Sequence, residues 1–317
     1  MRVLVTGIGG FVGPWVAAAL HVGGHVVHGL VRGDRSAALA AVGPVLHRGD
    51  VTDRAAVEAA VAAAAPDAVV HLAAWTDAAA AERDAEPVYR ANVGGTLALL
   101  SALRARAPQA RLLLASTSLV YGAIQRRELP VREDTPLRPT GVYGASKAAA
   151  EIAVLQWGRA YGLDVVVARP FNHTGPGQRV DFVCAAIARQ LVEVEAGRRD
   201  PVLRLGNLDP VRDFVDVRDV AAGYVALLER GRGGEAYNLC AGGEGVSIAE
   251  VVALFRTLAR VPVHVRSEPG RRRALDVERF VGSYEKVTAD TGWEPRIALL
   301  DTLRDVLDDW RARPPAP

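Results

Sequence analysis

Short runs of apolar, largely β-branched residues alternate with alanine-rich stretches through the first 170 residues of the chain. The apolar runs cover residues 2–7, 25–31, 45–51, 68–74, 111–117 and 164–170, and helices are expected near 12–22, 53–64, 86–106 and 143–161. Strands that are apolar at nearly every position are typical of a parallel sheet covered by helices on both faces. The pattern therefore predicts an α/β fold with a doubly wound, Rossmann-type parallel sheet.

The regular alternation of apolar runs and alanine-rich stretches ends after residue 170. Glycine and proline punctuate "RPFNHTGPGQ" (169–178), and two further helices are expected at 181–196 and 216–229, followed by a strand at 235–240. We expect a second, smaller and discontinuous domain. Residues 1–170, joined by 213–240, would form the first domain, and residues 171–212 and 241–317 would form the second.

The composition narrows the class of protein. Half of the residues are hydrophobic and the formal net charge is +2, so a large buried core is expected and a dedicated nucleic-acid binder is not. The chain has no run of about 18 apolar residues, so no membrane span is expected. The segment "MRVLVTG" leads directly into a strand pattern, so no cleavable leader is expected either. Cys184 and Cys240 match no metal-ligand spacing, so we expect buried thiols, no metal and a cytoplasmic location.

Three glycines follow the first strand in "VTGIGGFVG", which places Gly7, Gly10 and Gly13 between a strand and a helix. Glycines in this context permit a tight turn and let the backbone approach a pyrophosphate at the helix N-terminus. The motif predicts a dinucleotide site formed with Phe11 and Val12.

The end of the second strand bears on which nicotinamide dinucleotide is bound. An NAD site usually has an acidic residue there, whereas this chain reads "HGLVRGDRS". Arg32, helped by Arg35, is placed to accept a 2′-phosphate, although Asp34 lies nearby and Arg32 could equally be a solvated loop cation. NADP(H) is favoured and NAD(H) stays open. Asp50 and Val51 are expected to border the adenine.

Leu72, Ala73 and Ala74 follow the fourth strand and are expected to lie along the cofactor, where small residues permit close approach; they could equally be small for helix packing.

Lys147 and Lys286 are the only lysines among 38 basic residues, and Lys147 lies four residues after Tyr143 on a predicted helix. The two side chains therefore share one helix face. A neighbouring ammonium is expected to lower the pKa of the phenol, while its other donors hold the ribose. Thr117, at the end of the fifth strand, is expected to hydrogen-bond the substrate oxygen beside Tyr143, with Ser116 or Ser118 as the alternative.

The glycine turn, "STSLVYG", "YGASK" and "RPFNHTGPGQ" together resemble the extended short-chain dehydrogenase/reductases that act on nucleotide sugars. Together with "RLGNLDPVRDFVDVRD", they most resemble the GDP-4-keto-6-deoxy-mannose reductases and the related GDP-mannose 4,6-dehydratases. The dehydratases carry an acidic pair after the catalytic threonine, where this chain has Ser118 and Leu119. Leucine cannot transfer a proton, so reduction is favoured over dehydration.

The resemblance implies roles for further residues. Thr117, Tyr143 and Lys147 would be catalytic, Asn172 would contact the substrate or a phosphate, and Arg212 would contact the diphosphate. Asn92 would hold a water that relays protons to the lysine, or would only satisfy local backbone groups. The resemblance also implies a homodimer formed by helices 86–106 and 143–161. The remaining expected contacts are Pro170 and Asn172 for the cofactor and Ser118, Arg179, Arg271 and Arg273 for the substrate.

Two alternatives remain open from the sequence. A nucleotide-sugar 4-epimerase would use the same three catalytic residues with a tightly retained cofactor, and a catalytically idle dinucleotide-sensing protein would bind cofactor without needing Tyr143. Trp75, Trp157 and Trp293 are expected in the core rather than as base-stacking platforms.

Overall fold

The structure, a computed structural model, describes residues 1–33, 39–268 and 277–314. Its centre is a seven-stranded sheet in the order β11-β6-β5-β4-β1-β2-β3, and every pairing in it is parallel. The strands are β1 (Arg2–Thr6), β2 (Val26–Val31), β3 (Val45–Arg48), β4 (Ala68–His71), β5 (Arg111–Ala115), β6 (Val165–Pro170) and β11 (Ala236–Leu239). The predicted fold class, and each strand predicted from an apolar run, are confirmed.

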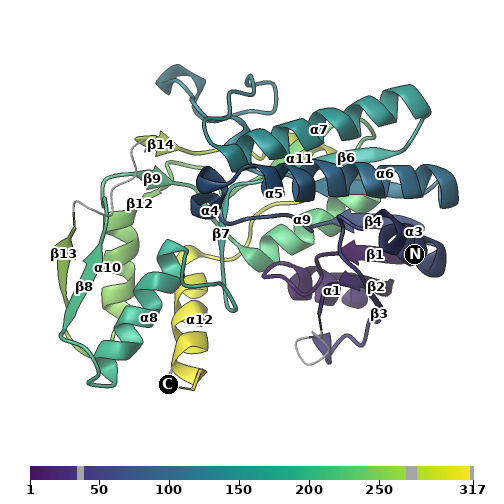
Figure 1. Ribbon diagram of the computed structural model, residues 1–317. Coiled ribbons are helices and arrows are strands. Elements are labelled where there is room, and N and C mark those ends of the chain that lie inside the picture. The colour runs from purple at the N-terminus through teal and green to yellow at the C-terminus, as the bar shows by residue number, and fades with distance from the viewer. Residues whose placement is uncertain (34–38, 269–276, 315–317) are drawn as a thin grey trace.

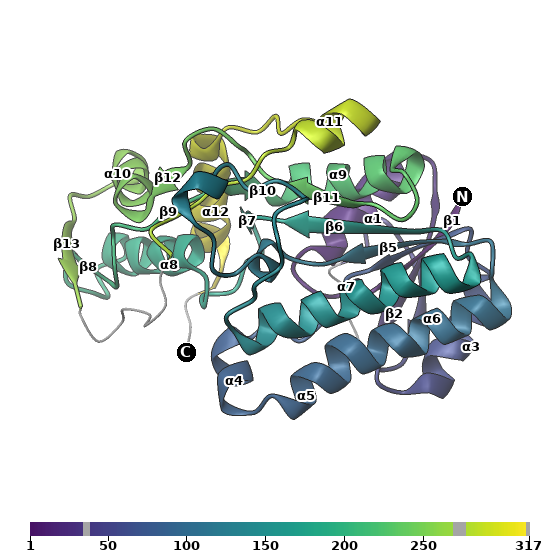
Figure 2. The same ribbon diagram turned by 90° about the horizontal axis from the view of Figure 1, so that it is seen from above.

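Helices cover both faces of this sheet (Figures 1 and 2). One face is covered by α1 (Gly13–Val22) and α9 (Val217–Arg230), and the other by α3 (Arg54–Ala64), α6 (Gly95–Arg106) and α7 (Val142–Tyr161). Val3 and Val5 of β1 pack into the first cluster and Leu4 into the second, so consecutive residues are all buried. Burial on both faces explains why the strands lack a polar alternation.

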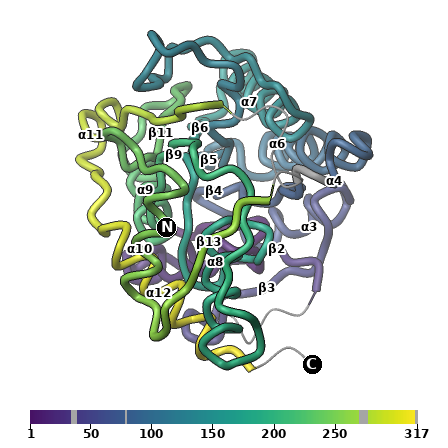
Figure 3. The backbone as a smooth tube through the Cα atoms, turned by 90° about the vertical axis from the view of Figure 1, so that its left-hand side faces the viewer, coloured from purple at the N-terminus to yellow at the C-terminus, as the bar shows by residue number. Residues whose placement is uncertain are grey.

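A second layer of helices lies beside the carboxyl ends of the strands, and Figure 3 views the molecule from this end. It has its own apolar cluster, formed by α8 (Val183–Glu195), α10 (Ile248–Leu258), α12 (Leu299–Ala312), β8 (Val202–Leu205) and β13 (His264–Ser267). The proposed boundaries between the two domains stay a prediction. Within the described ranges, no helix is long and apolar enough to cross a membrane.

Small elements connect the two parts. The strand β7 (Asn172–Thr174) pairs with β10 (Phe214–Asp216), and β9 (Val211–Arg212) lies between β12 (Val246–Ser247) and β14 (Arg279–Phe280). Helix α11 (Glu285–Thr291) precedes α12, and α4 (Ala78–Arg83) follows β4.

The helix expected over 86–106 is confirmed, but a π-helical turn interrupts its regular α-helical hydrogen bonding. Helix α5 (Glu86–Tyr89) passes into a π-helical turn, Arg90–Gly94, before α6 begins. Asn92 lies within this turn, is 1% exposed, and bonds residues remote in sequence. These long-range bonds stabilise the widened turn, and π-bulges are often found at functional sites.

Candidate active site

The glycine turn joins β1 to α1 and packs against the segment that follows β4. Gly7 has φ +70°, and an added Cβ would lie 2.8 Å from both the amide nitrogen and the Cα of Ala73. A Cβ on Gly13 would overlap the Ile8 carbonyl. Gly7 and Gly13 are therefore required by the packing of the chain itself, whereas Gly10 is exposed at the start of α1.

Phe11 and Val12 are half-buried beside these glycines. The Phe11 ring stacks on His173 of β7, with centroids 6.0 Å apart and planes 4° from parallel. The glycine turn is thus in contact with the strand that carries Asn172.

The segment after β4 is tied to the end of β1. The amide of Leu72 donates to the Thr6 carbonyl (3.1 Å), and the amide of Ala73 donates to the Thr6 hydroxyl (3.2 Å). Ala74 follows and is half-buried. The Ala73 backbone lies so close to Gly7 that packing within the protein alone explains the close approach of these two segments.

Arg32 and Asp50 lie at neighbouring strand ends. The Arg32 side chain is 81% exposed, and its Nη1 lies 3.8 Å from Oδ2 of Asp50. Although partial burial raises the pKa of Asp50, hydrogen bonds from the amide and hydroxyl of Thr52 and the charge of Arg32 hold this pKa below its usual value. Val51 packs against Gly95. Asp34 and Arg35 lie outside the described residues.

Tyr143, Lys147 and Thr117 meet where α7 begins beside the end of β5. Tyr143 is in the first turn of α7, and its phenol is hydrogen-bonded to Thr117. Thr117 is 8% exposed and also accepts a hydrogen bond from the Leu119 amide at 3.2 Å. Ser116 instead donates to Glu151, and Ser118 starts the 3₁₀ turn Ser118–Val120. Of the three hydroxyls, Thr117 is therefore the one bonded to Tyr143.

The protonation states follow from burial. Burial raises the pKa of Tyr143 to about 12, and the hydrogen bond with Thr117 opposes this only in part. The expectation that Lys147 lowers the pKa of Tyr143 is therefore wrong, because desolvation of the phenolate raises this pKa by more than the hydrogen bond with Thr117 lowers it. Burial also lowers the pKa of Lys147 to about 8, against the opposing charge of Glu151. Near neutral pH, Tyr143 holds its proton and Lys147 is mostly charged.

Asn92 fixes the loop after β4 rather than contacting Lys147 through its side chain. Its Oδ1 accepts from the amide of Trp75 (2.7 Å), and its Nδ2 donates to Ser146 Oγ (2.9 Å) and to the Trp75 carbonyl (3.3 Å). These bonds occupy the side-chain atoms expected to hold a relay water. The expected core position is wrong for Trp75, which is 37% exposed, whereas Trp293 is buried and Trp157 is half-buried.

The expected substrate residues lie on the second layer and its connections. Asn172 is half-buried on β7, directly after Pro170 and Phe171. The Nη1 of Arg212 donates to the carbonyls of Val211 (2.9 Å) and Val277 (2.7 Å), so this side chain braces β9. Arg179 is exposed, with Asp181 at 3.5 Å. Arg271 and Arg273 lie outside the described residues.

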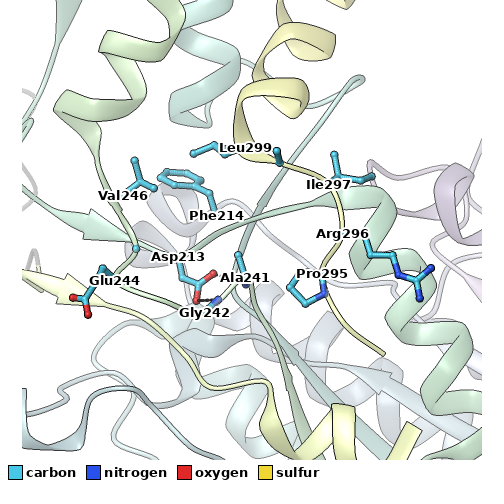
Figure 4. Close-up of a pocket in the computed structure, with 12 residues that line it drawn as sticks. Asp213, Phe214, Ala241, Gly242, Glu244, Val246, Pro295, Arg296, Ile297 and Leu299 are labelled. Atoms are coloured by element: carbon cyan, nitrogen blue, oxygen red, sulfur yellow. Dashed lines mark hydrogen bonds between the residues drawn. The ribbon is translucent and has the colours of Figure 1, made fainter. Parts of the chain in front are cut away.

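A pocket of about 410 Å³ lies on another part of the surface, between the 241–246 loop and the 295–299 segment (Figure 4). Asp213 at its base is 1% exposed and accepts hydrogen bonds from the amides of Ala241 (2.7 Å) and Gly242 (3.0 Å). These bonds make Asp213 a structural carboxylate. Thr117, Tyr143 and Lys147 do not line this pocket.

The sequence reasoning did not identify the buried polar groups behind the site. Glu151 and Arg169 form an ion pair (2.8 Å) with exposed side-chain fractions of 1% and 6%. His71 bonds the hydroxyls of Thr6 (2.6 Å) and Thr96 (3.1 Å). The signal for Glu151 was available, because it repeats the four-residue spacing of Tyr143 and Lys147 in "YGASKAAAE".

Comparison with known proteins identifies the family of the chain. The family described as GDP-mannose 4,6 dehydratase matches residues 4–306. The chain is 38% identical over 312 residues to GDP-6-deoxy-D-mannose reductase of Pseudomonas aeruginosa, covering 98% of each protein.

Two solved structures extend the comparison. The structure of RMD from Pseudomonas aeruginosa complexed with NADPH is 36% identical with a TM-score of 0.86, covering 99% of this chain and 100% of that one. UDP-glucose 4-epimerase of Thermus thermophilus in complex with NAD is 32% identical with a TM-score of 0.87, covering 98% and 99%. The chain therefore belongs to the GDP-mannose 4,6 dehydratase family, among the extended short-chain dehydrogenase/reductases of nucleotide sugars.

Proposed function

We propose that this protein is an NADPH-dependent reductase of the C4 ketone in a GDP-linked 4-keto-6-deoxy sugar, most simply GDP-4-keto-6-deoxy-mannose, with GDP-rhamnose or an epimeric GDP-6-deoxyhexose as product. The observation that carries the proposal is the phenol of Tyr143 beside the hydroxyl of Thr117, with Lys147 one helical turn further on and Leu119 in place of a second acid. The 38% identity to a GDP-6-deoxy-D-mannose reductase over 98% of the chain supports the substrate class.

The residues at the strand ends fit a dinucleotide. Gly10 is exposed at the N-terminus of α1, where backbone amides favour a phosphate, and Arg32 is exposed at the end of β2 with room for a 2′-phosphate. Asp50, Val51, Leu72, Ala73 and Ala74 border the same strand ends. The related structure solved with NADPH supports NADP(H), and the epimerase solved with NAD keeps NAD(H) open.

A nicotinamide held at the strand ends would supply the hydride for C4, and the residues of this chain would supply position and a proton. Thr117 hydrogen-bonds the ketone oxygen, and Tyr143 gives its phenolic proton to the alkoxide that forms there. The raised pKa of Tyr143 keeps this proton available at neutral pH. Lys147 lies one helical turn further on, where its ammonium stabilises the phenolate left behind and donates to the ribose.

The substrate would lie between the strand ends and the second layer. We assign Ser118, Asn172 and Arg212 to its binding, with Arg179, Arg271 and Arg273 as further candidates for the diphosphate. Residues 171–212 and 241–317 would form the substrate domain, and residues 1–170 and 213–240 the cofactor domain.

The expected assembly is a homodimer through α6 and α7. These helices run side by side on the outside of the sheet and expose Leu97 (38%), Ile152 (61%) and Tyr161 (46%) (Figure 2). Exposed apolar side chains on neighbouring helices are expected where two protein chains associate. The two unpaired thiols, Cys184 and Cys240, agree with a cytoplasmic location.

A 4-epimerase is the second candidate, because the likeness to the Thermus thermophilus epimerase covers 98% of the chain and the same three residues serve oxidation and reduction of C4. The test is the loss of NADPH absorbance with enzymatically prepared GDP-4-keto-6-deoxy-mannose. We expect NADPH to be oxidised in proportion to the keto sugar added, and we expect the rate of oxidation to be at least about 100-fold lower in Tyr143→Phe. No oxidation with GDP-, UDP- or dTDP-linked keto sugars would refute the reductase, and dinucleotide released on denaturation would then favour the epimerase.

A further inference from the structure

A carboxylate lies buried behind the proposed proton donor. Glu151 is one helical turn beyond Lys147 and two beyond Tyr143, so the three side chains share one face of α7. Glu151 is 1% exposed and Lys147 is 2% exposed. Burial of two ionisable groups at this depth is costly unless each has a partner of opposite charge.

Neighbouring strands hold the Glu151 carboxylate in place. Arg169 of β6 donates to its Oε2 from Nη2 (2.8 Å) and Nε (3.1 Å), and Ser116, at the end of β5, donates to its Oε1 through a short hydrogen bond. Because Ser116 precedes Thr117, the carboxylate is tied directly to the strand end that carries the hydroxyl bonded to Tyr143.

The Nη1 atom of Arg169, which is not bonded to Glu151, has hydrogen-bond partners of its own. It donates to the Tyr121 hydroxyl (2.9 Å) and the Glu133 carbonyl (3.1 Å), and Tyr121 donates to Asn238 of β11 (2.7 Å). The guanidinium therefore spans β6, β11 and the loop after β5. Glu151 has no freedom to turn away from Lys147 without breaking this network.

The other groups that face Lys147 cannot supply negative charge near neutral pH. His71 of β4 is held neutral, since burial and the charge of Lys147 lower its pKa to about 3. Tyr143, on α7, is protonated, because burial raises its pKa to about 12. Among these neighbours, Glu151 is the one anion.

We propose that Glu151, fixed by Arg169 and Ser116, is a positioning residue whose negative charge keeps the buried Lys147 charged beside the reaction centre. The inference rests on the proposed function and deepens it. Burial lowers the pKa of Lys147 to about 8, and the Glu151 charge prevents a larger fall. Without that charge, desolvation would leave a neutral amine at physiological pH, which could stabilise neither the phenolate nor the ribose contact.

The chain offers a direct measurement, because Lys147 and Lys286 are its only lysines. Protein grown with lysine labelled with ¹³C at Cε gives two lysine signals, which a Lys286→Arg variant assigns. The pH dependence of each chemical shift then reports the two ammonium groups separately, with no cofactor or substrate present. Lys286, paired with Glu235 at 2.7 Å, serves as the internal reference.

We expect the Lys147 signal of the wild-type protein to titrate near pH 8. In Glu151→Gln the midpoint should fall by about one unit or more while that of Lys286 is unchanged, and Glu151→Asp should keep part of the wild-type value. Glu195→Gln is the matched control, because Glu195 forms a comparable ion pair with Arg311 (2.7 Å) among the helices of the second layer. It should move neither midpoint.

An unchanged Lys147 midpoint in Glu151→Gln would overturn the proposal, and so would a wild-type midpoint below pH 7. Glu151→Gln leaves Arg169 buried without a counter-charge and is expected to lose stability. If it does not fold, the double variant Glu151→Gln/Arg169→Gln removes both charges. Because the guanidinium charge is lost as well, the downward shift should be smaller than in Glu151→Gln, and a midpoint at or above the wild-type value would refute the role.

Turnover gives a second readout. The alkaline limb of kcat/KM for NADPH oxidation should move down with the Lys147 midpoint in Glu151→Gln, giving about a fivefold loss at pH 8 for a one-unit shift and little loss at pH 6. A uniform loss at every pH would indicate a merely structural role. If the wild-type protein turns over no keto sugar, the proposed function fails, while the lysine titration still decides the role of Glu151.

Discussion

The glycine turn permits a quantitative test of whether Gly7 is required by its backbone angle alone or also by the neighbouring chain. Gly7 and Gly162 both have φ +70°. A Cβ on Gly162, at the end of α7, would meet nothing within 4 Å, whereas a Cβ on Gly7 would lie 2.8 Å from two backbone atoms of Ala73. Gly162→Ala therefore carries the backbone strain alone, and Gly7→Ala carries the strain and the clash.

The two costs can be worked out separately. A residue other than glycine in the left-handed region costs about 1–2 kcal/mol, and displacing a packed backbone segment adds about 1–3 kcal/mol. An unfolding entropy of about 2.1 cal/mol/K per residue makes each kcal/mol worth about 1.5 °C in a chain of this length. We therefore expect the melting temperature to fall about 2–3 °C in Gly162→Ala and about 3–7 °C in Gly7→Ala.

The assay is thermal unfolding followed by circular dichroism, together with NADPH titration of the folded variants. Gly7→Ala should also weaken NADPH binding at least about tenfold, because moving Ala73 moves the wall of the proposed cofactor site. Gly162→Ala should leave the NADPH dissociation constant unchanged. Equal losses of melting temperature in the two variants would refute the argument from the contact with Ala73.

Three further predictions concern the cofactor, the lysine and the assembly. Arg32→Ala should lower the ratio of kcat/KM with NADPH to kcat/KM with NADH about five- to tenfold. The effect is modest because the side chain is 81% exposed and would contact the phosphate in solvent. An unchanged ratio would show that Arg32 does not contact the 2′-phosphate. The kcat/KM of the wild-type protein should fall as the pH rises through about 8, where Lys147 loses its proton, and a flat profile to pH 10 would contradict this. The same shift should raise the free energy of unfolding between about pH 8 and 10.5, because an unfolded lysine there binds a proton that the folded one has released. Ile152→Arg should halve the mass measured by light scattering, since it puts a charge on the exposed apolar face of α6 and α7; an unaltered dimer would place the interface elsewhere.

Local patterns in the sequence were sufficient for much of the architecture. The seven strands of the sheet, the glycine turn between β1 and α1, and the shared helix face of Tyr143 and Lys147 each depend on spacing within a few residues. Such features follow from the two-residue and 3.6-residue periods of strands and helices. They do not require knowledge of what packs against them.

Features that depend on distant contacts were not predictable in this way. The helix expected over 86–106 contains a π-helical turn at Asn92, whose side chain bonds Trp75 and Ser146. Trp75 was expected in the core because of its size, but the loop that carries it runs along the surface. Neither outcome is visible in the local sequence, because the partners lie 17 and 54 residues away.

The sequence by itself determined which residues could perform the chemistry, because a phenol, an ammonium and a hydroxyl at these strand and helix ends have few other uses together. Only the tertiary structure decided their protonation. It encloses Tyr143 in part and buries Lys147, raising the pKa of the phenol and lowering that of the ammonium, and it places the ion pair of Glu151 and Arg169 on the same side of α7. Desolvation depends on everything that surrounds a group, and those surroundings come from segments far apart in the chain.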